Sequence, residues 1–283
     1  MSGSRLAAMA TAILWGFTYL LTTDMLPHHP ALVAAVRALG GAAFLLAIGW
    51  ELPPRDWLGR LFILGTLNTG VFFGLFFIGV MRLPGGVAAI FQALGPIAVL
   101  LLAWGILRKT PSAMQFLSVV MGVVGVTLVV LRAGVRIDGI GVAAALASTV
   151  SLSLGGVLMN RWGKAPIGFA AFTGWQLLVG GVELALVTLL IGDFGGGITV
   201  TNVVAFAILA VLLTGIPFLL WFKAISRIGA VNVMPFILLT PVTALVLDAV
   251  FKGLIPTAIQ LLGVAIVMAA LVVNYLASRA AQK

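Results

Sequence analysis

The sequence is poor in charge and contains no cysteine. Only 8% of its 283 residues are charged, whereas soluble globular domains carry about 25%, so the chain lacks the polar surface that water requires. The absence of cysteine excludes disulfides and thiolate metal sites. The two histidines, His28 and His29, are adjacent, and the carboxylates are dispersed along the chain. No clustered acid, base or metal-ligand set is apparent, so we expect no enzymatic activity, no metal and no cofactor.

Long apolar runs dominate the sequence instead. Hydrophobic residues make up 62% of the chain, and the mean hydropathy is +1.24. A helix that crosses a bilayer needs about 20 apolar residues. Ten runs meet this length, at Leu6–Thr23, Pro30–Ile48, Leu58–Val80, Pro84–Leu107, Ser112–Leu131, Ile137–Met159, Pro166–Ile191, Val200–Phe222, Gly229–Phe251 and Ile255–Ala277. They predict an all-α integral membrane protein of ten transmembrane helices, the first a true span rather than a cleaved signal peptide.

The basic residues indicate how these helices are oriented. The net charge is +9, but the basic residues are scattered between the runs, so we expect them to orient helices and not to bind a nucleic acid. Placing the N-terminus in the cytoplasm puts most of them inside, at Arg5, Arg55, Arg60, Arg108, Lys109, Arg161, Lys164, Lys223, Arg227, Arg279 and Lys283. Only Arg82, Arg132, Arg136 and Lys252 then lie outside. This bias predicts that both termini are cytoplasmic.

Two stretches of the sequence repeat at a shift of 145 residues. RLPGGVAAIFQALGP (82–96) corresponds to RIGAVNVMPFILLTP (227–241). The matched pairs are Arg82 with Arg227, Phe91 with Phe236, Pro96 with Pro241, Pro111 with Pro256 and Gln115 with Gln260. Helices 4 and 5 thus correspond to helices 9 and 10. Because each repeat has five helices, an odd number, the second repeat crosses the membrane in the opposite direction, as in many secondary transporters. We predict repeats at residues 1–135 and 136–283.

Several motifs on these helices resemble a known family. Trp15-Gly16 in helix 1, Arg37 in helix 2, Gly95-Pro96 in helix 4 and Thr240-Pro241 in helix 9 resemble the drug/metabolite transporter superfamily, in its ten-helix EamA-type branch. Within that branch the chain looks most similar to the YddG-type exporters of aromatic amino acids. The resemblance implies a central cavity lined mainly by helices 1, 3, 4, 6, 8 and 9, with helices 5 and 10 at the periphery.

The candidate substrate-binding residues are aromatic and neutral polar side chains inside the runs. Rings suit flat apolar solutes, and amide or hydroxyl groups suit an ammonium or a carboxylate. The candidates are Trp15, Tyr19, Asn68, Phe77, Phe91, Gln92, Ser151, Thr214, Trp221, Asn232 and Phe236. The alternative role for such residues is helix packing or lipid contact. Pro96 and Pro241 free backbone carbonyls near the middle of helices 4 and 9, and they are candidate hinges.

Two charged residues lie deep inside predicted helices, Arg37 in helix 2 and Glu183 in helix 7. Such charges are usually functional or paired. Helices 2 and 7 are not among those implied to line the cavity, so we expect both residues to serve packing or fold assembly. The two could also pair with each other. Helix 1 has no carboxylate like the one that drives proton exchange in the short four-helix members of the superfamily.

These features predict a secondary transporter. We expect a monomer in the bacterial inner membrane that exports aromatic or other apolar amino acids, and similar small amphipathic metabolites, by alternating access. A multidrug or lipophilic-cation exporter, and a passive facilitator of small metabolites, are the alternatives.

Overall fold

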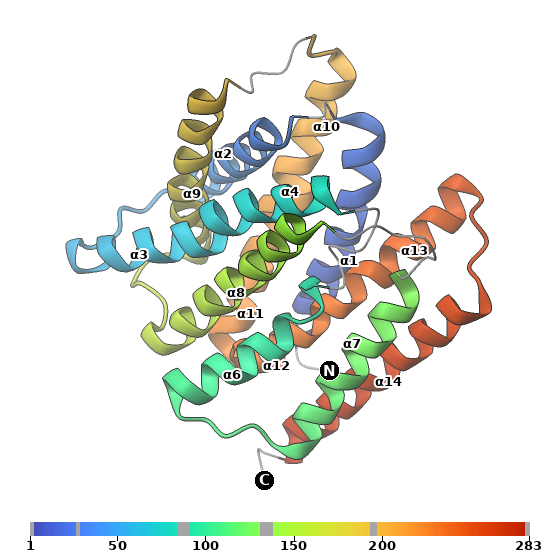
Figure 1. The fold of residues 1–283 in the computed structure, drawn as a ribbon. Helices are drawn as coiled ribbons and strands as arrows, with labels where there is room; N and C mark the ends of the chain where they lie inside the picture. The colour runs from blue at the N-terminus through green and yellow to red at the C-terminus, as the bar shows by residue number, and fades with distance from the viewer. Residues whose placement is uncertain (1–2, 27–28, 84–90, 131–137, 193–196, 281–283) are drawn as a thin grey trace.

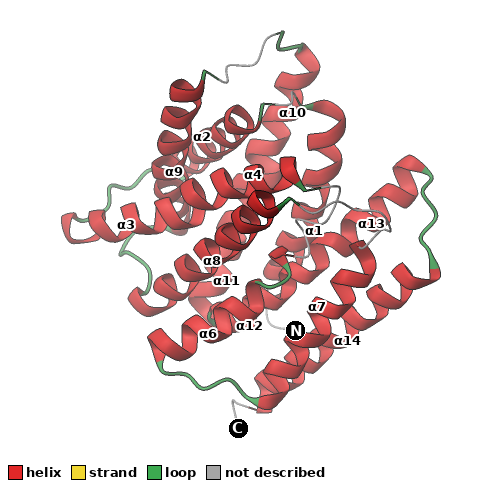
Figure 2. Cartoon of the chain, in the orientation of Figure 1, coloured by secondary structure: helices red, strands yellow, loops and turns green. Residues whose placement is uncertain are grey.

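The computed structural model describes residues 3–26, 29–83, 91–130, 138–192 and 197–280, and every regular element in this part of the chain is a helix (Figure 2). The first repeat contains α1 (Gly3–Met25), α2 (Pro30–Ile48), η1 (Arg55–Trp57), α3 (Leu58–Gly65), η2 (Thr66–Val71), α4 (Phe72–Arg82), α6 (Gly95–Leu107) and α7 (Ala113–Val130). The second contains α8 (Gly139–Trp162), α9 (Phe169–Ile191), α10 (Val200–Ala210), η3 (Val211–Gly215), α11 (Ile216–Ile228), α12 (Ala230–Val233), η4 (Met234–Leu238), α13 (Leu239–Lys252) and α14 (Ala258–Ala280).

Together these elements form ten membrane crossings. In the described residues eight helices are long and apolar enough to span a bilayer, and two shorter apolar helices, Gly95–Leu107 and Ala113–Val129, account for crossings 4 and 5. The chain is therefore a multi-pass membrane protein, and the prediction of a ten-helix fold is confirmed. The first part of crossing 4, residues 84–90, lies outside the described residues.

Crossings 3 and 8 are not uniform α-helices, a feature that the hydropathy pattern did not predict. Each contains a π-helical segment, η2 in crossing 3 and η3 in crossing 8. The shift of 145 residues that relates the repeats also relates Thr66, where η2 begins, to Val211, where η3 begins. Short π-helical segments often mark functional sites, and here both repeats have one at the same place.

The two prolines of the sequence repeat stand at the start of helices rather than inside them. The α-helix of crossing 4 is interrupted at Ala93 and Leu94, and α6 begins at Gly95 with Pro96 in its first turn. In crossing 9 a 3₁₀ segment, η4, precedes α13, whose first turn contains Pro241. Proline is well tolerated in a first turn because the N–H it lacks would have no intrahelical partner there.

The first helix of each repeat packs against the other repeat. The first helix of the first repeat, α1, packs against α11 and α13 of the second, and α8, the first helix of the second repeat, packs against α4 and α6 of the first. Two further pairs join equivalent helices, α2 with α9 and α7 with α14. The α7–α14 pair lies at one side of the bundle (Figure 1), as the resemblance implied. Each repeat is thus completed by the other.

Close helix contacts depend on glycine where α9 meets η2. A Cβ atom on Gly180 would collide with the backbone of Gly65 and Gly70 and with the side chain of Thr69. We predict that Gly180→Leu lowers the thermal unfolding midpoint in detergent by several degrees, because overpacking of this kind costs about 1–3 kcal/mol or more.

Gly105→Leu is the matched control, since no atom lies within 4 Å of the added Cβ position. Fluorescence-detected size-exclusion chromatography after heating measures both variants. Equal midpoints for the two variants would show that the α9–η2 contact is not tightly packed.

Candidate functional site

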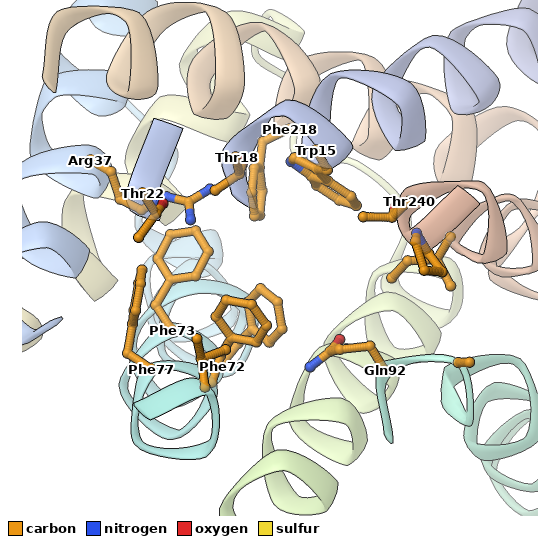
Figure 3. A pocket seen from close by; sticks show the side chains of 15 residues that line it. Trp15, Thr18, Thr22, Arg37, Phe72, Phe73, Phe77, Gln92, Phe218 and Thr240 are labelled. Atoms are coloured by element: carbon orange, nitrogen blue, oxygen red, sulfur yellow. The ribbon is translucent and has the colours of Figure 1, made fainter. Parts of the chain in front are cut away.

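A cavity of about 110 Å³ lies within the bundle (Figure 3). It extends from the middle of the bundle toward the end where α1 finishes and α2 begins. Its lining residues come from crossings 1, 2, 3, 4, 8 and 9, and are Trp15, Thr18, Thr22, Arg37, Phe72, Phe73, Phe76, Phe77, Val80, Gln92, Ala93, Phe218, Ile237, Thr240 and Pro241. Crossing 2 therefore contributes through Arg37, whereas crossing 6, which the resemblance implied, contributes none of these residues.

One wall of the cavity is built from aromatic rings in tilted and edge-to-face contact. Phe72 lies 5.2 Å from Phe73 and 5.8 Å from Phe76, measured between ring centroids. Phe73 meets Phe218 edge to face at 5.6 Å, and Phe218 meets Trp15 at 5.3 Å. Phe73 and Phe218 are separated by 145 residues, so the two repeats touch through equivalent side chains. The wall is apolar, and it suits a flat solute.

The face of α1 that borders the cavity carries polar atoms without partners. Trp15, Thr18 and Thr22 are three and four residues apart, which places them on one helix face. The indole Nε1 of Trp15 and the hydroxyls of Thr18 and Thr22 are buried, and no described residue forms a hydrogen bond with any of them. Buried polar groups normally have a partner. A ligand in the cavity would supply it.

Arg37 brings a positive charge to the same cavity. Its side chain is buried, its Nε donates to Thr214 Oγ1 at 3.1 Å and its Nη2 donates to the Leu213 carbonyl at 3.4 Å. The guanidinium lies 4.3 Å from the centre of the Phe73 ring, and Figure 3 shows it beside Thr18 and Thr22. An ion pair between Arg37 and Glu183, one of the two structural roles considered for them, is absent from the described residues, and Arg37 lines the cavity.

A closely packed core adjoins the cavity in the described part of the bundle. Trp221, Phe222, Ile225 and Val233 are almost completely buried, and the Trp221 ring lies 5.0 Å from that of Trp15. Phe222 likewise contacts the cavity residue Phe218, at 5.5 Å between ring centroids. This packed core therefore borders the cavity directly, at Trp15 and Phe218.

Three of the predicted binding residues, Trp15, Phe77 and Gln92, line the cavity together with the candidate hinge Pro241. The amide of Gln92 donates to Ser148 Oγ at 3.1 Å, which leaves its carbonyl oxygen as an acceptor. Tyr19 lies in α1, but its side chain lies outside the described part of the chain.

The other predicted residues lie around the cavity and hold helices together. Asn68 donates to Gln176 at 2.9 Å, Ser151 donates to the Leu67 carbonyl at 2.8 Å, Thr214 accepts from Arg37, and Asn232 donates to the Ile228 carbonyl at 2.7 Å. Phe236 packs against the main core, and the Trp221 ring contacts that of Trp15. Phe91 packs near Leu83 and Ala145. The candidate hinge Pro96 lies in the first turn of α6.

Several cavity residues were not predicted, among them Thr18, Thr22, Phe73 and Phe218. A signal for each was present in the sequence. Thr18 and Thr22 share the helical face of Trp15, and the 145-residue shift relates Phe73 to Phe218. Arg37 was noticed, but its helix was not expected to line the cavity.

Comparisons with known proteins agree with this architecture. The model of the EamA-like transporter family matches residues 4–131 and 139–276. The chain belongs to this family. Its two matched segments are the two repeats, and its members are secondary transporters of the drug/metabolite transporter superfamily rather than enzymes.

Individual relatives span nearly the whole chain. It is 35% identical to Protein PecM of Dickeya dadantii (strain 3937), over 92% of this chain and 88% of that protein. It is 25% identical to the "Probable amino-acid metabolite efflux pump" of Salmonella typhimurium, over 94% of this chain and 93% of that protein. A solved crystal structure superposes over the full length of both chains with a TM-score of 0.78 at 19% identity, which shows a common fold.

The absence of cysteine makes the cavity directly testable. We predict that Val80→Cys, a half-buried position in the cavity wall, reacts with a methanethiosulfonate reagent at least about tenfold faster than Ala224→Cys, because a thiol must be solvated and reachable to react. Ala224 is 1% exposed and lies in the packed core that adjoins the cavity, so it is the matched control. Mass spectrometry of the purified variants measures both rates, and equal rates would contradict a one-sided cavity.

Proposed function

We propose that this EamA-family transporter exports aromatic or other apolar amino acids, and similar small amphipathic metabolites, as YddG-type exporters do. The observation that carries this proposal is the composition of the cavity: an aromatic wall lies opposite unpaired donors on α1, next to a buried guanidinium. Pockets of this kind bind ligands that have one apolar end and a few precisely placed polar groups.

An aromatic amino acid matches each part of this cavity. Its ring would stack on Phe72, Phe73 and Phe218, whose edges and faces are already arranged for ring contacts. Its carboxylate would accept hydrogen bonds from the α1 face and from the guanidinium of Arg37. Its ammonium would donate to the free carbonyl oxygen of Gln92. The name of the Salmonella relative agrees with this substrate class.

The positive charge of Arg37 argues against a lipophilic cation as substrate. A second cation beside the buried guanidinium would be repelled in a medium of low dielectric constant. A zwitterion adds no net charge to the cavity, and its carboxylate would be attracted to the guanidinium.

During alternating access, the cavity would close toward its present side as a path opened through the packed core on the other side. Pro96 and Pro241 begin the helices that follow the breaks in crossings 4 and 9, so rotation at these breaks would move α6 and α13 without unwinding an α-helix. We further propose a monomer in a bacterial inner membrane with both termini cytoplasmic, a topology supported by the positive-inside bias.

Uptake into proteoliposomes tests the substrate class. We expect labelled tryptophan and phenylalanine to be transported, threonine to be transported more slowly, and a lipophilic cation not at all. Tryptophan loaded on the opposite side should accelerate exchange, because a carrier returns faster when it is loaded. Transport of the cation alone would overturn the amino-acid assignment, and rapid net flux without accelerated exchange would identify a passive facilitator.

The polar face of α1 gives a sharper prediction. Thr18→Val removes one unpaired hydroxyl at almost constant volume, and we expect the KM for tryptophan to rise about tenfold, since a hydrogen bond to a charged group contributes about 1.5–3 kcal/mol. Thr188→Val is the matched control, because that hydroxyl bonds to the Leu184 carbonyl of its own helix. A KM unchanged in Thr18→Val would remove α1 from the binding site.

If the two prolines act as hinges, replacing them should impair transport but not folding. Pro96→Ala and Pro241→Ala should reduce tryptophan exchange severalfold while expression and size-exclusion profiles stay close to those of the wild type, because alanine keeps a helix start but can extend the helix backward. Normal exchange in both variants would leave the breaks without a role in transport.

A further inference from the structure

Glu183 is an acidic side chain close to the middle of a membrane helix. It lies three residues after Gly180, the midpoint of α9, and hence about 4.5 Å along the axis from the helix centre. The other acidic residues whose side chains are described, Glu51, Asp56, Asp138 and Asp248, lie in loops, at a helix start or in the last turns of a helix. Neither the cavity nor the proposed transport cycle uses Glu183.

The carboxylate of Glu183 has a neutral partner. The hydroxyl of Thr66, at the start of η2, donates to Glu183 Oε1 at 2.5 Å. The second oxygen, Oε2, lies directly over Gly70, where a Cβ atom would collide with it. No basic side chain among the described residues forms an ion pair with Glu183.

The charged groups of the surrounding helices are engaged elsewhere or distant along their helices. Elements α2, η2, α3 and α11 pack against α9. On α2, Arg37 is directed to η3 and Phe73; on α3, Arg60 lies over Trp57 in the preceding turn. The basic residues of α11 lie in its second half, and η2 has no charged residue. Among the described residues nothing compensates the charge of an ionised carboxylate here, and an uncompensated charge is costly inside a membrane.

The repeat indicates that packing does not require an acid at this position. Gly70 of η2 and Gly215 of η3 are related by the shift of 145 residues. The space over Gly70 is filled by the Glu183 carboxylate, and the space over Gly215 is filled by the ring of Phe44. Because an apolar ring serves in one repeat, a carboxylate in the other needs a different explanation.

Glu183 is connected to the cavity through η2. This segment continues directly into α4, whose Phe72, Phe73, Phe76 and Phe77 form the ring wall. In a π-helical segment the backbone hydrogen bonds span five residues instead of the four of an α-helix, and a change between these two forms rotates the residues that follow. A change at Thr66 is therefore transmitted to the cavity wall.

We propose that Glu183 is a proton-binding site that couples substrate exchange to a proton gradient. Ionised Glu183 accepts from Thr66 and holds η2 in its π-helical form; protonated Glu183 is neutral, competes as a donor and releases η2. One proton is bound at the carboxylate from one side of the membrane and is released unchanged to the other during a transport cycle. The direction of coupling rests on the proposed function, whereas the proton site itself does not.

Infrared spectroscopy without substrate tests the site directly. Acidification of the purified protein in lipid should produce a carboxyl C=O band at the high frequency typical of apolar surroundings, in the wild type and in Glu51→Gln but not in Glu183→Gln. Glu51 is the matched control because its carboxylate is exposed and bonds to the Gly168 N–H. Persistence of the band in Glu183→Gln would overturn the proposal.

Transport tests the coupling. In proteoliposomes with an imposed pH difference, wild-type protein should accumulate labelled tryptophan. Glu183→Gln should accumulate at least about tenfold less, a difference equivalent to 1.4 kcal/mol. Its tryptophan exchange at equal pH should stay within about twofold of the wild-type rate, which shows that the variant is folded and active.

Equal pH-driven accumulation in wild type and Glu183→Gln would overturn the coupling role. If wild-type protein moves no tryptophan at all, the proposed function fails, and the infrared result then decides the proton site on its own. The two failures are thus distinguishable.

Discussion

In hydrocarbon, every backbone polar group must find its partner within the protein, and the breaks in these helices depend on that constraint. Crossing 6 supplies hydroxyls to the interrupted crossings: Ser151 donates to the Leu67 carbonyl of η2, Thr149 to the Phe91 carbonyl and Ser153 to the Gly95 carbonyl. Arg37 does the same for the Leu213 carbonyl of η3. Irregular backbone is therefore confined to the centre of the bundle, where neighbouring helices satisfy it, and this is also where the cavity lies.

The packing of each repeat's first helix against the other repeat determines where that centre is. Because α1 packs on the second repeat and α8 on the first, equivalent side chains meet near the axis between the repeats. The contact of Phe73 with Phe218 at 5.6 Å is the clearest example. A cavity on such an axis is bounded by both repeats, so that a small rotation of one against the other changes its access. This is the geometry expected of a carrier.

The repeats differ at two positions where charge enters the membrane. Arg37 of α2 borders the cavity beside Thr214 of η3, whereas Glu183 of α9 contacts Thr66 of η2. Each charge thus lies against the π-helical segment of the opposite repeat. Arg37 lines the cavity, and Glu183 contacts the segment that continues into the ring wall. The two repeats share one fold, but a basic side chain contacts η3 and an acidic side chain contacts η2.

Hydropathy and the 145-residue shift determined the ten crossings, the two repeats and the position of both prolines, because long apolar runs and repeated residues are local features of a sequence. The family resemblance and the aromatic or polar character of the side chains added three cavity residues, Trp15, Phe77 and Gln92. The π-helical segments, the cavity positions of Thr18 and Arg37, and the separation of Arg37 from Glu183 were decided only by the tertiary structure. An apolar run does not record which face meets protein or lipid, and a side chain acquires its partner from helices distant in sequence. Arg37 meets Thr214 across 177 residues, and no pattern within either helix could specify that contact.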